Sequence, residues 1–128
     1  MINEPEGART VAIVLNRDLL FGLRIRNALA SLGLDSRFVP DADRFVEALG
    51  AHGESTAIGI VDMNGAVAWD SVRDALAASS DAPPILAFGP HVDIDGRRAA
   101  KGAGVSRIVS NGKFHSDMAG LIDRYRRR

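Results

Sequence analysis

The sequence predicts a single α/β domain in which a parallel sheet is covered by helices on both faces. Two kinds of apolar segment alternate along the chain: short continuous runs of aliphatic residues, and longer segments with apolar residues three or four positions apart. The short runs are typical of strands buried on both faces, and the spaced segments of amphipathic helices. The length of 128 residues fits one domain, which we expect to span residues 9–128.

The first predicted unit begins with a continuous aliphatic run at residues 10–15, which indicates a buried strand. Apolar residues then recur on one face of a helix, and Gly33 is placed to end that helix. The residues of this face are Phe21, Ile25, Ala28, Leu29 and Leu32.

The second unit begins with a short, more polar strand at residues 35–39. Its polarity favours an edge position in the sheet, where a strand is half exposed. Asp41 or Asp43 is expected to cap the following helix, which should end between Gly50 and Gly53.

Two further units follow. A fully apolar strand at residues 57–61 ends at Asp62 and precedes a helix at residues 69–76. A fourth strand, residues 85–88, precedes a short alanine-rich helix that Asp95 is expected to cap. The alanines expected to point inward are Ala99, Ala100 and Ala103.

The last unit is a strand at residues 105–109 and a helix that Ser116 is expected to cap. Five strand–helix units joined by right-handed crossovers leave few topologies. The prediction is therefore a flavodoxin-like (βα)5 three-layer sandwich with a five-stranded parallel sheet in the order 2-1-3-4-5.

Composition excludes several classes of function. Sixteen basic residues balance sixteen acidic ones, so no bulk attraction to nucleic acid or anionic membrane is expected. The absence of cysteine excludes disulfides and fits a cytoplasmic location. No apolar stretch approaches the roughly 20 residues that cross a bilayer. Residues 1–8 are expected to be a flexible lead-in.

Asp62 is the strongest candidate for a functional residue. It ends a central strand, at the edge where open α/β sheets place their ligands, and a lone carboxylate there suggests a phosphoryl acceptor or a metal ligand. The loops after the strands should place further residues around one pocket at this edge. These pocket residues are Asn16, Arg17, Asp18, Asn64, Gly89, His91 and Asn111.

In the order and spacing of these elements, the chain resembles response-regulator receiver domains over about residues 9–126. The likeness rests on the loop Asn16-Arg17-Asp18, on Asp62 at the end of the third strand, and on a Pro-Ile-Leu fourth strand. The turn Ala103-Gly104-Val105-Ser106 also enters the fifth strand as a comparable turn does in that family.

The resemblance implies a degenerate member, or pseudo-receiver. Receivers bind magnesium through two adjacent acids, accept the phosphoryl group on the third-strand aspartate, and contact it through a Thr or Ser and a Lys. Asp62 matches the acceptor, but Asn16 and Arg17 replace the acids, Gly89 the hydroxyl and Asn111 the lysine. We therefore expect a non-enzymatic module without phosphotransfer or cofactor, in which Asp62 is a structural anchor that is hydrogen-bonded or paired with Arg17.

Two alternatives remain open. In the first, Asp62, Asp18 and Asn16 hold Mg²⁺ in a working phosphoacceptor, with Asp18 and Asp62 as the metal-binding carboxylates. In the second, the domain binds a small ligand or is enzymatic and uses the edge pocket near Asn16, Asn64, His91 and Asn111. A separate candidate is a two-carboxylate, one-histidine metal set formed by Asp18, Asp62 and His91.

A protein partner, or self-association, is the expected output. The resemblance places the contact on the fourth helix, fifth strand and fifth helix, with no role for nucleic acid or membrane. The charged residues of this interaction face are Arg97, Arg98, Lys101, Arg107, Asp117, Asp123 and Arg124.

Overall fold

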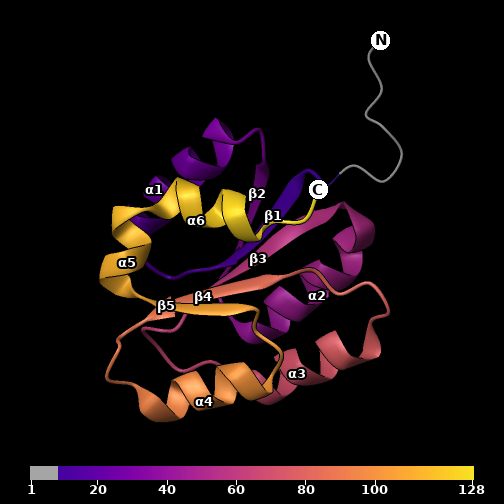
Figure 1. Ribbon diagram of the computed structural model, residues 1–128. Helices are drawn as coiled ribbons and strands as arrows, with labels where there is room; N and C mark the ends of the chain where they lie inside the picture. Colours follow the sequence, from indigo (N-terminus) through magenta and orange to yellow (C-terminus); the bar gives the residue numbers. More distant parts are fainter. Residues whose placement is uncertain (1–8) are drawn as a thin grey trace.

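Five parallel strands form one sheet in the order β2-β1-β3-β4-β5, which confirms the predicted fold class and strand order (Figure 1). The computed structural model describes residues 9–128, and the predicted lead-in at residues 1–8 lies outside the described residues. The strands are β1 (Val11–Leu15), β2 (Asp35–Val39), β3 (Thr56–Asp62), β4 (Ile85–Gly89) and β5 (Arg107–Ser110).

Helices cover both faces of the sheet (Figure 1). One face carries α1 (Leu19–Ser31), α5 (Asn111–Ser116) and α6 (Met118–Tyr125). The other carries α2 (Ala42–His52), α3 (Trp69–Ala78) and α4 (Ile94–Gly102), with a short 3₁₀ turn, η1 (Gly53–Ser55), before β3.

Each face has its own apolar core. Ile25 and Leu29 of α1, Phe114 of α5 and Ile122 of α6 pack on one side of the sheet. Helices α2, α3 and α4 contribute a second cluster on the other side, which includes Phe45, Val72 and Ala100. The central strand β3 is buried at every position before Asp62, which explains why it has no polar alternation in the sequence.

The start of α4 differs from the prediction, whereas the start of α2 agrees with it. Asp93 caps α4 by accepting a hydrogen bond from the Gly96 backbone N–H, so the expected cap at Asp95 is wrong. The helix begins at Ile94. Of the three alanines expected to point inward, Ala100 and Ala103 are buried and Ala99 is exposed. At α2, the cap is Asp41, one of the two residues expected.

The chain after β5 also differs from the prediction. Ser110 caps a short helix, α5, whose Phe114 side chain is fully buried against the sheet. Ser116 is the last residue of α5 and donates its hydroxyl to the Lys113 carbonyl, so it does not cap the last helix. One buried aromatic residue gives no helical periodicity, which explains why the sequence pattern missed this turn.

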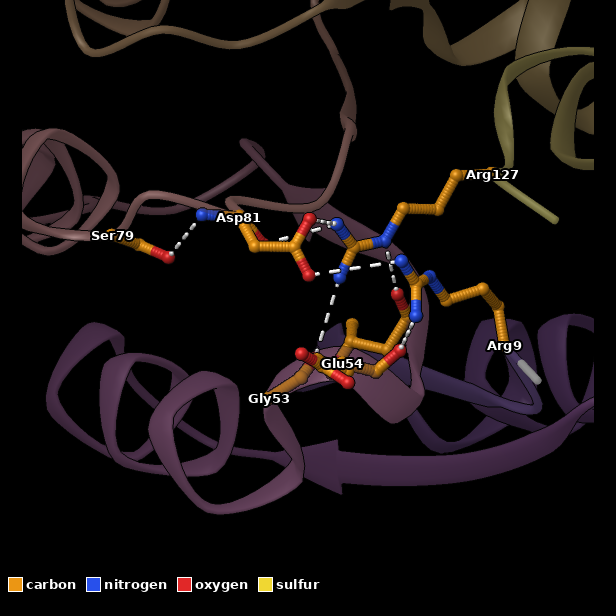
Figure 2. A network of polar contacts seen from close by, with 7 residues as sticks. Arg9, Gly53, Glu54, Ser79, Asp81 and Arg127 are labelled. Atoms are coloured by element: carbon orange, nitrogen blue, oxygen red, sulfur yellow. Dashed lines mark hydrogen bonds and ion pairs between the residues drawn. The ribbon is translucent and has the colours of Figure 1, made fainter. Parts of the chain in front are cut away.

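At the N-terminal edge of the sheet, Arg127 makes hydrogen bonds to several segments of the chain, and we call this set of contacts the Arg127 clasp (Figure 2). Its Nε donates to the Thr56 carbonyl at 2.8 Å, and its Nη1 donates to the Asp81 carboxylate at 2.8 Å. Arg9 reaches the same carboxylate, with Nη2 at 3.7 Å from Asp81 Oδ2. The Arg127 side chain is only 18% exposed. Of the basic residues at the C-terminus, Arg127 is therefore part of the fold, whereas Arg128 is largely exposed.

We expect Gly59→Ala to destabilise the protein by about 1–3 kcal/mol, because the site has no room for a methyl group. A Cβ at Gly59 would lie 2.6 Å from Ile85 Cδ1 and 2.8 Å from Phe45 Cζ. The control is Gly50→Ala in α2, where nothing lies within 4 Å; it should stabilise by roughly 0.5–1 kcal/mol through lower chain entropy. Urea unfolding of both variants measures the difference, and equal effects would contradict this packing.

We expect Arg127→Ala to destabilise the protein by about 1–3 kcal/mol, because backbone carbonyls and the Asp81 carboxylate lose their donor. The neighbouring variant Arg128→Ala is the control. Arg128 is 66% exposed and, among the described residues, bonds only to Asp123, so its loss should cost no more than about 1 kcal/mol. Thermal and urea unfolding compare the two, and an equal loss of stability would refute the clasp.

Candidate functional site

Asp62 lies half-buried at the C-terminal end of β3, where its carboxylate is held by the loop that follows. Its Oδ1 accepts hydrogen bonds from the backbone N–H and the side-chain Nδ2 of Asn64, both at 2.8 Å. A carboxylate that binds the backbone two residues further on stabilises a tight turn. Asp62 therefore orders the start of the β3–α3 loop.

Asn64 extends this contact across the sheet to Asn111, the first residue after β5. Asn64 Nδ2 donates to Asn111 Oδ1 at 2.9 Å, and Asn111 Nδ2 donates back to Asn64 Oδ1 at 2.7 Å. The two amides form a reciprocal pair that is electrically neutral. The ends of β3 and β5 are thus joined through Asp62, Asn64 and Asn111 without a lysine.

Arg17 ties together three loops at the same edge. Its Nε donates to the Pro40 carbonyl at 2.9 Å, and its Nη2 donates to the Ala66 carbonyl at 3.1 Å. Its guanidinium lies against Gly65, where a Cβ would come within 2.5 Å of Nη1. Arg17 thus directs these donors to backbone carbonyls, and no ion pair joins it to Asp62 among residues 9–128. Asp62 was expected to be held by hydrogen bonds or by a pair with Arg17, and the structure contains the hydrogen bonds.

Of the three residues expected to bind magnesium, the two carboxylates line one cavity and Asn16 does not. Asp62, Asp18 and Arg17 line a cavity of about 300 Å³. Asn16 lines a different one, between α1 and β2. Asp18 Oδ1 is engaged as the cap of α1, accepting from the backbone N–H groups of Leu20 and Phe21. Magnesium prefers several hard oxygens around one point, and this donor set fits it poorly.

Gly89 leaves no room for the hydroxyl residue that receivers carry at this position. It is the last residue of β4 and is buried. A Cβ there would lie 2.8 Å from Met63 Cβ and 3.4 Å from the Met63 carbonyl carbon. Because the Cβ of Met63 is attached directly to the backbone, a Thr or Ser at this position would require the segment just after β3 to shift.

His91 is not gathered into the pocket. It is exposed in the turn before α4 and does not line the cavity at Asp62. Within the part of the chain that the structure describes, no three His, Asp or Glu side chains are placed to hold a metal ion. The alternative metal set of Asp18, Asp62 and His91 is therefore not brought together.

His115 is a residue of this region that the sequence prediction left out. Its ring stacks on Phe21 of α1 with centroids 4.1 Å apart, and it meets Phe88 and Phe114 edge-on. Both ring nitrogens are buried without a hydrogen-bond partner among the described residues. This burial lowers the pKa of His115, as does the charge of Arg24, while Asp62 and Asp18 act in the opposite direction. No sequence pattern signals such a position, because it depends on the short helix α5.

The residues of the predicted interaction face lie on α4, β5 and the chain up to α6. Arg98, Lys101, Arg107, Asp117 and Arg124 are exposed, while Arg97 and Asp123 are partly buried. Asp123 Oδ1 lies 3.0 Å from nitrogens of both Arg126 and Arg128, so its charge is already paired.

Solved structures that are similar to this chain include receiver domains and response regulators. The chain is similar to Vibrio cholerae chemotaxis protein CheY4, with a TM-score of 0.73, 12% identity, and coverage of 92% of this chain and 99% of that one. It is also similar to the receiver domain of Pseudomonas aeruginosa sensor histidine kinase PA1611, which has a magnesium ion in its active-site cleft, with a TM-score of 0.71, 16% identity and coverage of 92% and 98%.

A third similar structure is a response regulator from Thermotoga maritima, with a TM-score of 0.69, 14% identity and coverage of 91% and 96%. At these identities the likeness establishes the fold: the chain has the CheY-like receiver fold. No family model matches the sequence, and no curated protein matches it. In the described part of the chain, no helix is both long and apolar enough to cross a membrane.

The pKa of His115 predicts a pH dependence of stability. A histidine whose folded-state pKa is lowered contributes stability that is complete above its ordinary pKa of 6.5, and that contribution is lost as the pH falls below this value toward the lowered pKa. The urea concentration at the unfolding midpoint should therefore decrease when the pH is lowered from about 7.5 to 5.5. The decrease should be smaller in His115→Gln. The control His91→Gln removes an exposed histidine. An unchanged fall in His115→Gln would show that other groups cause it.

Proposed function

We propose that this chain is a receiver-like signalling module that acts through protein–protein contact, without phosphotransfer, in the cytoplasm. The hydrogen-bond chain from Asp62 through Asn64 to Asn111 carries the proposal. In receivers, a lysine after the fifth strand contacts the phosphoryl group on the aspartate. Here neutral amides make the corresponding link from β3 to β5, so the link needs no phosphoryl group.

Two neighbouring features support this reading of the site. Phosphoryl transfer to a carboxylate gathers negative charge, which magnesium normally offsets, and the carboxylate of Asp18 is used as a helix cap instead. Gly89, packed against Met63, cannot carry the hydroxyl that would respond to a phosphoryl group. A phosphorylated Asp62 would therefore lack both its counter-ion and its usual sensor.

The output surface that we propose is the face of α4, β5 and α6. Its charged residues include five cations, Arg97, Arg98, Lys101, Arg107 and Arg124, against Asp117 and Asp123. Asp123 is already paired with the chain's own arginines. The remaining charge is positive, so this face favours an acidic partner surface, and complementary charge would speed the encounter.

A working phosphoacceptor is the second candidate. One observation favours it: only Oδ1 of Asp62 accepts hydrogen bonds from the described chain, and the residue lines a cavity of about 300 Å³. The second oxygen therefore remains available to attack a phosphoryl donor.

Acetyl phosphate distinguishes the two candidates. After incubation with acetyl phosphate and MgCl₂, intact mass spectrometry should show the unmodified chain, with the same spectrum for Asp62→Asn. A receiver domain with its acidic pair and lysine, treated in parallel, shows that the reagent is active. An adduct of one phosphoryl group on the wild type that is lost in Asp62→Asn would overturn the proposal and establish the phosphoacceptor.

A further inference from the structure

Three leucines at the start of α1 are exposed close together. Leu19 is 91% exposed, Leu20 77% and Leu23 56%. A single exposed leucine needs no explanation, but a cluster within five positions marks a surface used for contact. The buried residues of α1, Ile25 and Leu29, lie further along the helix, so the leucines contribute little to the core.

Two of these leucines, Leu19 and Leu23, border a groove between α1 and the edge strand β2. Leu19, Gly22, Leu23 and Arg26 recur at helical spacing on one face of α1, and with Phe38 of β2 they line a cavity of about 300 Å³. A Cβ at Gly22 would lie 2.9 Å from Asn16 Nδ2 and 3.7 Å from the Phe38 ring. Glycine at this position therefore keeps the groove open.

The groove carries uncompensated positive charge. α1 contains Arg24 and Arg26 but no acidic residue. The Arg26 guanidinium lies 5.9 Å from the centroid of the Phe38 ring and makes no ion pair within residues 9–128. Arg17 lines the same groove. The carboxylate in the lining, Asp18, is bound to backbone N–H groups of the helix that it caps.

We propose that this groove docks an amphipathic helix of a partner protein, with acidic side chains flanking its apolar stripe. A helix is about 10–12 Å across, wide enough to cover the exposed surfaces of Leu19 and Leu23 as well as the hollow beside Phe38. A small ligand within the hollow would leave those leucines in water. Apolar anchors in the groove and carboxylates near Arg17 and Arg26 match this mode of recognition. Asp62 does not line the groove, so the inference is independent of phosphotransfer.

A displayed library of helix-forming peptides, selected on the immobilised full chain, tests the proposal. Enriched peptides should carry apolar residues at helical spacing beside Asp or Glu. The double variant Leu19→Ser/Leu23→Ser should weaken their binding by about tenfold or more, because apolar contact area is lost. The control Val92→Ser/Ile94→Ser changes two equally solvent-accessible residues, 73% and 66% exposed, before and in α4; it should bind as the wild type does.

Charge reversal gives the second readout. Arg26→Glu should shift the enriched peptides from acidic toward basic flanks. Selection without enrichment, equal binding by the leucine variant, or an unchanged preference in Arg26→Glu would overturn the proposal. Binding lost instead in Arg98→Glu/Lys101→Glu would assign the peptides to the α4 face, which supports the proposed function and overturns this inference. Wild-type binding to vesicles of phosphatidylglycerol, lost in the leucine variant, would make the groove a membrane surface and also overturn it.

Discussion

The side chain of Asn64 holds the C-terminal edge of the sheet in one arrangement. Its Nδ2 donates to the Asp62 carboxylate and to Asn111, while its Oδ1 accepts from Asn111. Parallel strands bring their carboxyl ends to one edge, where several polar loop ends must find partners. A single amide meets this need for β3 and β5 because it donates and accepts at the same time.

Among the described residues, the C-terminal edge of the sheet has no cluster of acids placed to bind a metal, and hydrogen bonds connect its loops. In receivers, adjacent acids repel one another until a cation binds, whereas here the same loop offers Asn16 and Arg17. Among residues 9–128, Arg17 forms no ion pair with a carboxylate. It binds the carbonyls of Pro40 and Ala66 and so connects the loops after β1, β2 and β3. The edge is therefore held by hydrogen bonds to backbone and amide groups, which do not depend on bound ions.

The fold was predictable because it depends on apolar patterning, while the site depends on contacts between distant loops. The aliphatic run before Asp62 identifies a buried strand whatever its partners are. By contrast, the pairing of Asn64 with Asn111 spans 47 positions, and either residue alone looks like an ordinary loop asparagine. The cap at Asp93 was missed because Asp95 offers the same chemistry two residues away, and only the backbone path decides between them. The stacked, buried position of His115 follows from α5, a helix too short to show periodicity.

These contacts bear on how such a module transmits a signal. A switch requires an element with two arrangements of similar free energy, and an effector that binds one of them better. At the Asp62 edge, the amide pair and Arg17 make hydrogen bonds that connect the loops. At the opposite edge, Arg127 donates hydrogen bonds to the start of β3 and to the loop before β4. Under the proposed function, information would pass through this protein by which partners occupy its exposed faces, with α1 and α4 on opposite faces of the sheet.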